Sequence, residues 1–206
     1  MTQLGFDLGP EPLPQIEAAF KTAHDFDRAL STWMGPQKGV SKLFAHPINT
    51  PLGTMVAVCD AAQLHLLEFA DRVELPKELK KLGAEIGAIS PGQTKITRAL
   101  LDQLARYFDG GLEQFDVALA LHGTEFTKTV WNALLKLPFG TTTSYGALSE
   151  SLGNPDAVRA VARANGANQI AILIPCHRVI GADGTLTGYA GGLWRKRALL
   201  ALESKP

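Results

Sequence analysis

The sequence contains only two cysteines, Cys59 and Cys176. Two cysteines cannot build the disulfide framework of a small secreted domain, and a reducing compartment suits a free, reactive thiol. Long apolar runs are also missing: no stretch approaches the roughly 20 residues that a membrane-spanning helix needs, and the N-terminus lacks the basic-then-apolar pattern of a secretory signal. We therefore expect a cytoplasmic protein with no membrane partner.

The chain has no net charge, because 20 Lys and Arg balance 20 Asp and Glu. Taken alone, this balance argues against a nucleic-acid partner. The distribution is uneven, however: residues 1–122 hold 11 basic against 15 acidic side chains, and residues 123–206 hold 9 against 5. An acidic part joined to a basic part indicates that the basic part meets an anion.

The sequence also lacks closely spaced pairs of His and Cys residues of the kind that bind zinc. His46, His65, His122 and Cys59 are possible zinc ligands, but they lack the short paired spacings typical of zinc sites. Scattered histidines in a sheet domain are more often ordinary core or surface residues. We predict no metal and no other cofactor.

One stretch concentrates chemistry, the aliphatic run 170–174 followed by Pro175-Cys176-His177-Arg178. A thiol reacts as its thiolate, which needs a nearby base or positive field, and His177 or Arg178 could supply either. For an arbitrary free cysteine, a small buried core residue is the more common interpretation, and it remains open for Cys176 from this segment alone.

Residues 1–44 are predicted to form an N-terminal extension, with a poorly ordered tail over 1–15 and an amphipathic helix from Ile16 to Trp33. About twenty of these residues resemble the closing portion of an AraC-type helix-turn-helix, which is too little to form that domain alone. The alternative is an amphipathic helix that packs on the main body.

Residues 45–121 are predicted to form a small α+β domain with an antiparallel sheet. Its expected elements are a hairpin of Thr54–Cys59 with Leu64–Phe69, helices over Leu75–Leu82 and Thr94–Phe108, and a strand over Leu112–Leu121.

Residues 122–206 are predicted to form a mostly helical domain that contains a helix-turn-helix. The expected helices begin after Thr124 and cover Tyr145–Leu152, Asp156–Ala164 and Leu193–Glu203. The polar side of the Asp156–Ala164 helix is mostly alanine. Small residues let a helix lie close in a minor groove, although they could also pack against neighbouring helices.

These features together resemble the O6-alkylguanine-DNA alkyltransferase family, the methylated-DNA–protein-cysteine methyltransferases. The resemblance covers residues 123–203 and, less distinctly, 50–69. It rests on these residues: Gly123-Thr124-x-Phe126, Val130-Trp131, Pro138-x-Gly140, Ser144-Tyr145-Gly146, Arg159-Ala160-Val161, Ala164-Asn165-Gly166-x-Asn168, Pro175-Cys176-His177-Arg178-Val179-Ile180, Gly188-Tyr189-x-Gly191-Gly192, Arg195-Lys196 and Leu199-Leu200-x-x-Glu203.

The resemblance implies a DNA repair protein that transfers an alkyl group from O6-alkylguanine, with O4-alkylthymine as a further expected substrate, irreversibly to its own cysteine in a single turnover. Cys176 would be the acceptor and His177 the base that takes its proton through a water. Glu203 would orient His177, and Asn168 would tie the turn before the cysteine to an active-site strand.

The partner implied is double-stranded DNA, bound through its minor groove by a monomer. Arg159 would replace the extruded base in the stack, and Tyr145 would press on the adjacent phosphate. Ala157 and Ala160 would face the groove. Arg163 departs from the family's small residue and either adds a phosphate contact or crowds the groove.

The resemblance also implies a substrate pocket. Tyr189 would donate to the flipped guanine, Ala190 and Gly191 belong to the loop that closes one wall, and the backbone of Cys176 and Val179 would read the guanine edge. Gln169, where proline is usual, is a second departure.

Three other functions are compatible with parts of the sequence. A lesion-binding alkyltransferase-like protein would lack Cys176, which is present here. A transcription regulator would depend on residues 1–45. A cysteine hydrolase would need an oxyanion hole, and Gly188-Tyr189 offers no obvious one.

Overall fold

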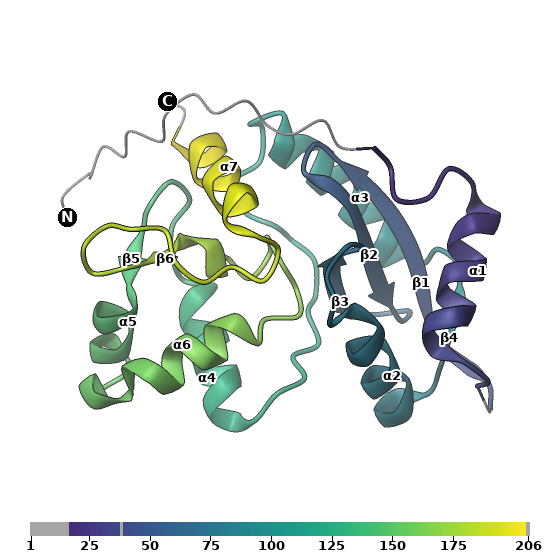
Figure 1. Cartoon of the computed structure of the whole chain (residues 1–206), viewed down its shortest axis with the longest axis horizontal. Coiled ribbons are helices and arrows are strands. Elements are labelled where there is room, and N and C mark those ends of the chain that lie inside the picture. Colours follow the sequence, from purple (N-terminus) through teal and green to yellow (C-terminus); the bar gives the residue numbers. More distant parts are fainter. Residues whose placement is uncertain (1–16, 38, 205–206) are drawn as a thin grey trace. The chain divides into compact units, whose positions relative to one another are not determined.

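The structure, a computed structural model, describes residues 17–37 and 39–204. The chain forms two compact units, of which one spans Ile16–Leu121 and the other holds His122–Pro206. Figure 1 labels the helices and strands of both units. The predicted tail over residues 1–15 lies outside the described part of the chain.

The N-terminal unit contains a four-stranded sheet with the order β3-β2-β1-β4. The strands are β1 (Ser41–Thr50), β2 (Gly53–Cys59), β3 (Leu64–Phe69) and β4 (Ala88–Pro91). The β2–β3 hairpin confirms the prediction, and β1 pairs antiparallel with β2. The sheet is mixed rather than wholly antiparallel, because β4 pairs parallel with β1 and returns to the sheet through a helix instead of a tight turn.

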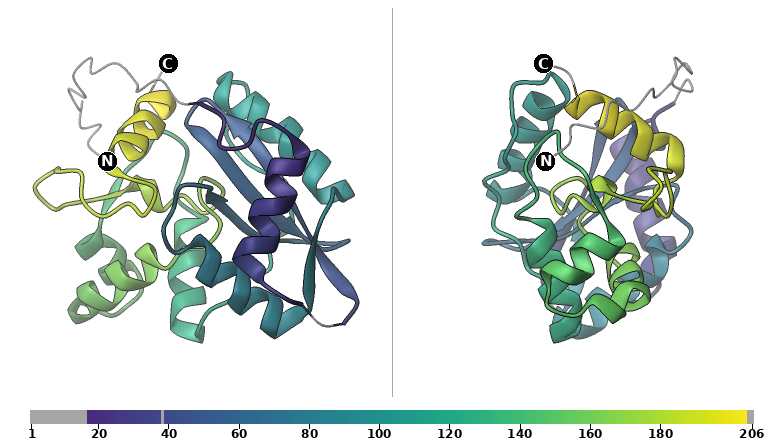
Figure 2. Two further views of the ribbon diagram at one scale, coloured as in Figure 1. Left: turned by 45° about the vertical axis from the view of Figure 1, so that its right-hand side comes forward. Right: turned by 90° about the vertical axis from the view of Figure 1, so that its left-hand side faces the viewer.

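Two helices, α1 (Ala23–Met34) and α2 (Leu75–Ile86), cover one face of this sheet. Figure 2 shows both in front of the strands in its left view. Phe26 and Leu30 of α1 are buried in one core with residues of β1, β2 and α2. Because α1 belongs to this core, we propose that the sheet domain begins before α1 rather than at residue 45.

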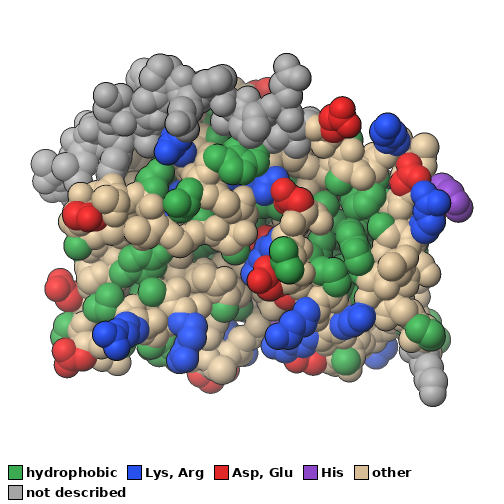
Figure 3. All heavy atoms as spheres, viewed as in Figure 1, with side chains coloured by type: hydrophobic (Ala, Val, Ile, Leu, Met, Phe, Trp, Pro, Cys, Tyr) green, Lys and Arg blue, Asp and Glu red, His purple; other side chains and the backbone are tan. Residues whose placement is uncertain are grey.

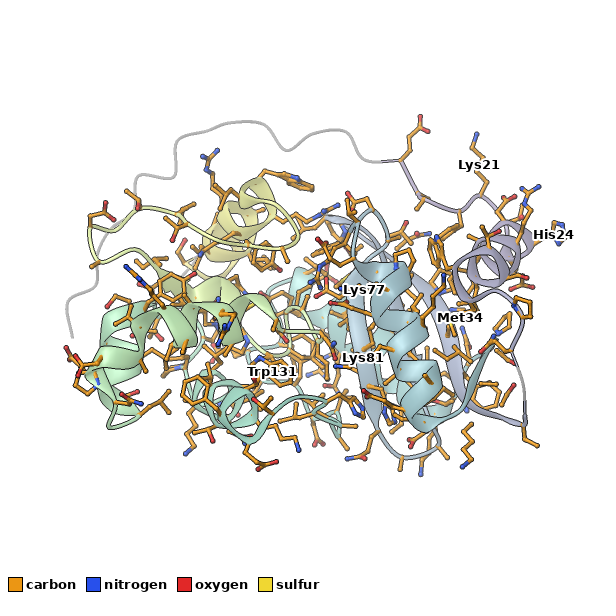
Figure 4. The ribbon with its side chains drawn as sticks, turned by 60° about the horizontal axis from the view of Figure 1, so that its bottom comes forward. Lys21, His24, Met34, Lys77, Lys81 and Trp131 are labelled. Carbon is orange, nitrogen blue, oxygen red and sulfur yellow. The ribbon has the colours of Figure 1, made fainter. Side chains whose placement is uncertain are left out.

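Helix α1 begins later than the predicted Ile16. Thr22 and Asp25 form a capping box at its start, and Gly35, with a φ of 65°, ends it. Residues 17–37 thus contain one helix and not a pair joined by a turn, which favours the packed amphipathic helix over a helix-turn-helix remnant. Lys21 and His24, at the start of α1, point away from the sheet (Figure 4).

Helix α3 (Lys95–Phe108) contacts β1 and β2 and matches the helix predicted over Thr94–Phe108, with Thr94 as its N-cap. The strand predicted over Leu112–Leu121 is wrong, because this segment makes only one bridge, between Leu64 and Leu119. Its alternating side chains are half-buried, but the Gln103 side chain binds both backbone groups of Asp116 and so satisfies them without a neighbouring strand.

The C-terminal unit is mostly helical, as predicted. Its elements are α4 (Glu125–Leu134), β5 (Thr143–Ser144), α5 (Tyr145–Ser151), η1 (Pro155–Ala157), α6 (Val158–Gly166), η2 (Cys176–Arg178), β6 (Val179–Ile180) and α7 (Leu193–Glu203). β5 and β6 pair in parallel. Within the described residues, the chain has no helix of the length and apolarity that crossing a membrane requires.

Helices α5 and α6 form the predicted helix-turn-helix. Ser144 caps α5, and Gly153 turns the chain with a φ of 71°. Trp131, labelled in Figure 4, is buried on α4 and donates its indole N–H to the carbonyl of Ala164 at 2.9 Å. This bond fixes α6 on α4 and leaves the opposite side of α6 at the surface.

Candidate active site

Cys176 lies on a single 3-10 turn, η2, and not at the end of a strand. The aliphatic run before it is buried but forms tight turns, in which the N–H of Ile174 donates to the carbonyl of Ile170 at 3.0 Å. Residues 170–174 form no strand, because their backbone groups bond within the segment and to the Asn168 side chain. β6 follows directly after the turn.

The thiol of Cys176 is held by Asn168. The Asn168 Nδ2 lies 3.1 Å from Sγ and donates to the carbonyl of Ile174 at 2.9 Å, while Oδ1 accepts from the N–H of Ile170 at 2.9 Å. Asn168 is 2% exposed and Cys176 is 7% exposed. The predicted pair thus lies together, with the thiol almost out of solvent.

His177 points away from this frame toward α7. Its Nε2 lies 2.9 Å from Oε1 of Glu203, and both side chains are buried. Arg178 donates to the same carboxylate through Nε at 2.8 Å and Nη2 at 2.9 Å. One carboxylate therefore holds an imidazole and a guanidinium that are neighbours in the chain.

These contacts set the protonation of the cluster. Burial alone would raise the pKa of Glu203, but hydrogen bonds from His177 and Arg178 lower this pKa to about 2. Burial lowers the pKa of His177 below its usual 6.5, and the Arg178 and Lys196 charges act in the same direction. At neutral pH Glu203 is thus a carboxylate that accepts a hydrogen bond from Nε2–H, and the ring is neutral.

Tyr145, at the start of α5, lies next to the loop that contains Tyr189. Tyr145 is half-buried, interacts with Thr187 and Asn165, and has a pKa raised by burial. A Cβ on Gly188 would stand 3.2 Å from the Tyr145 hydroxyl, so this loop passes close to the ring. Tyr189 is half-buried in the same loop.

Of the predicted pocket residues, Val179 and Gly191 are bonded by side chains of α7. The buried Lys196 donates to the carbonyls of Val179 at 2.6 Å and of Thr187 at 2.5 Å. Arg195 donates to the carbonyl of Gly191 at 2.8 Å. Two basic side chains thus join β6 and the loop 187–191 to one helix, and Ala190 lies exposed between these bonds.

The surface of α6 carries the predicted DNA-contacting residues. Arg159 and Arg163 are exposed one helical turn apart, and Ala157 and Ala160 are half-buried beside them. In the space-filling view, Lys and Arg side chains stand out over the helix-turn-helix segment, at the lower left in Figure 3. The acceptor cluster and this basic surface belong to one unit.

The candidate zinc ligands do not gather. His65 lies 3.1 Å from Asp60 as an ion-pair partner, and His46 bonds Gln93 at 2.7 Å. Cys59 is buried in β2, where burial raises its pKa to about 11. Among residues 17–37 and 39–204, no three His, Cys, Asp or Glu side chains are grouped to hold a metal.

The sequence and fold match known proteins. Residues 125–205 match the family described as 6-O-methylguanine DNA methyltransferase, DNA binding domain. A methylated-DNA–protein-cysteine methyltransferase of Mycobacterium tuberculosis (strain CDC 1551 / Oshkosh) is 60% identical over 103 residues, which span 50% of this chain and 62% of that protein. The protein of the same name from Salmonella typhimurium is 45% identical over 170 residues, 79% of this chain and 96% of its own length.

The chain belongs to the methylated-DNA–protein-cysteine methyltransferase family. A solved structure of Mycobacterium tuberculosis OGT in complex with DNA is 43% identical, has a TM-score of 0.68, and covers 78% of this chain and 92% of its own. The two-unit architecture of this methyltransferase-family chain thus has a solved counterpart.

Sequence reasoning about this methyltransferase-family chain missed two parts of the site. The sequence suggested Arg178 only as a charge near the thiol. In the structure it donates two hydrogen bonds to the Glu203 carboxylate, which His177 also contacts. Lys196 appears in the sequence only as part of the Arg195-Lys196 motif, whereas its side chain is buried in the structure. The adjacency of His177 to Arg178 could have signalled the first, but no pattern marked a lysine that points inward.

Proposed function

We propose that this protein repairs DNA by accepting the alkyl group of O6-alkylguanine on Cys176, once per chain. The observation that carries this proposal is the buried arrangement of Cys176, Asn168, His177 and Glu203. A thiol with a neutral histidine beside it and a carboxylate behind that histidine has the nucleophile, base and orienting group of covalent catalysis.

The chemistry follows from the two ring nitrogens of His177. Nε2 donates to Glu203, and Nδ1 has no hydrogen-bond partner within the described residues. Nδ1 is thus the atom that accepts the thiol proton, through a water because adjacent side chains do not face each other. The thiolate attacks the alkyl carbon, the carbon–O6 bond breaks as the carbon–sulfur bond forms, and Tyr189 donates to the departing guanine.

The thioether that forms has no leaving group, which supports a single turnover. A thioether is stable to water and to a histidine base at neutral pH, so its carbon–sulfur bond is not broken again. One chain therefore removes one alkyl group, and O4-alkylthymine would react by the same displacement at its own oxygen.

The buried thiol also requires extrusion of the base. Cys176 is only 7% exposed, so a guanine within a duplex cannot bring its O6 substituent to Sγ. We propose that α6 enters the minor groove through Ala157 and Ala160, that Arg159 fills the gap left in the stack, and that Tyr145 presses on the neighbouring phosphate. The protein would act as a monomer, because acceptor and DNA surface lie in one unit.

The test is a duplex that carries O6-[methyl-³H]methylguanine, supplied in excess over the protein. We expect one methyl group per chain, recovered on the peptide that contains Cys176, and no transfer by Cys176→Ala. The Cys176→Ala variant should still bind the duplex. A wild-type protein that stays unlabelled would contradict the proposal. Loss of duplex binding by Cys176→Ala would indicate that the cysteine has a structural role instead.

Arg163 provides a separate test of the DNA surface. If its guanidinium contacts a phosphate, Arg163→Ala should make the negative slope of log K against log salt concentration shallower by about 0.9. Between 50 and 200 mM salt, the variant would then lose roughly 3.5-fold less affinity than the wild type loses. Lys136→Ala, at an exposed lysine outside the helix-turn-helix, is the control and should leave the slope unchanged. Tighter binding by Arg163→Ala at every salt concentration would mean that Arg163 crowds the groove.

A further inference from the structure

Ile172 has an unusual backbone conformation. Its φ is 71°, and no other residue apart from glycine has a positive φ in residues 17–37 and 39–204. The N–H of Leu173 donates to the carbonyl of Ala171 at 2.9 Å, which closes a three-residue γ-turn around Ile172. With positive φ this turn is the rare and strained form.

The residue type makes the conformation costly. A β-branched side chain brings its Cβ close to the following carbonyl in the left-handed region, so an isoleucine there is a true outlier. Such strain persists only where the surroundings fix the backbone, and it concentrates at functional sites. Here Ile172 is 2% exposed and lies four residues before Cys176.

The strained turn is held inside a closed frame of hydrogen bonds. Asn168 bonds the N–H of Ile170 and the carbonyl of Ile174, and the N–H of Ile174 bonds the carbonyl of Ile170. Ile172 is at the apex of the loop between these two residues. The distance between Ile170 and Ile174 therefore depends on the tight turn that Ile172 makes.

The same frame ends at the sulfur. The carbonyl of Ile174 accepts from Asn168 Nδ2 and also from the N–H of Cys176 at 2.7 Å, across a second γ-turn at Pro175 with φ −80° and ψ 59°. Asn168 Nδ2 reaches Sγ at 3.1 Å. A shift of Ile174 would thus move both the amide that contacts Sγ and the backbone that bears it.

We propose that Ile172 is a positioning residue for the alkyl transfer. Its left-handed turn fixes the carbonyl of Ile174 and through it aims Sγ at the alkyl carbon. The inference rests on the proposed function, since it names a residue that serves Cys176 as acceptor. Misplacement of a reacting atom by about 1 Å can cost on the order of 100-fold in rate, so a looser turn should be visible in kinetics.

The experiment compares Ile172→Ala with Ile172→Gly in the full chain. Both remove the side-chain packing, but only glycine removes the penalty for positive φ and frees the backbone. We expect Ile172→Gly to unfold at the same or a higher urea concentration than Ile172→Ala. Its methyl-transfer rate constant at saturating duplex should nevertheless be about tenfold lower, with the same Kd for DNA.

A matched pair at Ile170, which is buried and has ordinary negative φ, is the control. There glycine should be less stable than alanine, as in any ordinary backbone position. Equal rate constants for the two Ile172 variants, or rates that rise with stability, would overturn the inference. If neither variant folds, a φ below zero at residue 172 in a crystal structure of the wild-type protein would overturn it instead.

Failure of this inference is distinguishable from failure of the proposed function. Wild-type protein is labelled in parallel, and absence of transfer there would contradict the function itself. Transfer by the wild type with equal rates for both variants would leave the function intact and reject only the role of Ile172.

Discussion

Glu203 is the most informative residue to change, because two buried side chains depend on its charge. Glu203→Gln keeps the shape but removes the negative charge, and so resembles the protonated acid. The pKa of Glu203 falls from 4.5 to about 2, and this difference corresponds to about 3 kcal/mol of stability at neutral pH. We expect the variant to lose that amount, since Arg178 is then left buried without a counter-charge.

The loss should depend on pH in a defined direction. Glu203 has a lowered pKa in the folded protein, so its contribution is complete above pH 4.5 and disappears as the pH falls toward 2. Urea unfolding of wild type and Glu203→Gln at pH 7 and at pH 3 measures this. The difference between the two proteins should be large at pH 7 and much smaller at pH 3.

Glu203→Gln should also lower the rate constant of alkyl transfer. The neutral amide cannot stabilise His177 when that residue takes the thiol proton, so we expect a rate constant about 10² to 10⁴-fold lower at saturating duplex. Glu150→Gln, at an exposed glutamate on α5, is the control for removing one negative charge. A Glu203→Gln protein as stable as Glu150→Gln, or one whose deficit is the same at both pH values, would refute the reasoning.

Three further predictions concern residues outside this cluster. Burial raises the pKa of Glu68 to about 8, so wild type loses stability as the pH rises from 4.5 to 8 and this carboxyl is forced to ionise. The free energy of unfolding of Glu68→Gln, measured in urea, should therefore rise relative to wild type by about 2–5 kcal/mol over this pH range. Cys59, with its pKa near 11, should take up no thiol reagent at pH 8 in folded Cys176→Ala. Gly140 and Gly153 share a φ of 71°, but only at Gly140 would a Cβ meet a backbone oxygen, at 2.8 Å, so Gly140→Ala should lower the Tm more than Gly153→Ala.

The helices were the most predictable part of this chain. Thr94, Ser144 and Thr124 each begin a helix as capping residues, and the helix over Leu193–Glu203 has the predicted bounds. Capping is local: one side chain satisfies backbone donors two or three residues away, so the sequence alone states it. The same holds for the turn at Gly153.

The strands were less predictable because their pairing is not local. The sequence did not predict β1, because His46 and Pro47 interrupt its alternation of apolar and polar residues. In the structure β1 lies between β2 and β4 in the sheet, and its inward-facing residues are buried. The run over 170–174 has the apolar composition of a buried strand, yet it has no strand to pair with and bonds Asn168 instead. The apolar composition of such a run predicts that its residues are buried. It does not predict which groups form hydrogen bonds with their backbone N–H and C=O groups.

The resemblance predicted that Glu203 contacts His177 and that Asn168 ties the turn before the cysteine, but not the backbone turn that presents Cys176, His177 and Arg178. Cys176, His177 and Arg178 are adjacent, and a strand would turn the middle side chain opposite to the other two. On the 3-10 turn, the thiol instead meets Asn168 while both basic side chains reach Glu203. Only the turn explains how one carboxylate serves two consecutive residues.

That arrangement has an electrostatic consequence for the resting protein. A carboxylate alone beside a buried histidine would raise its pKa and favour the charged ring, which could not accept a proton from Cys176. Arg178 occupies the carboxylate from the other side and opposes that effect, and the pKa of His177 lies below its usual value. Burial is the largest cause that lowers the pKa of His177, and the Arg178 guanidinium adds to it, so that together they keep the imidazole neutral.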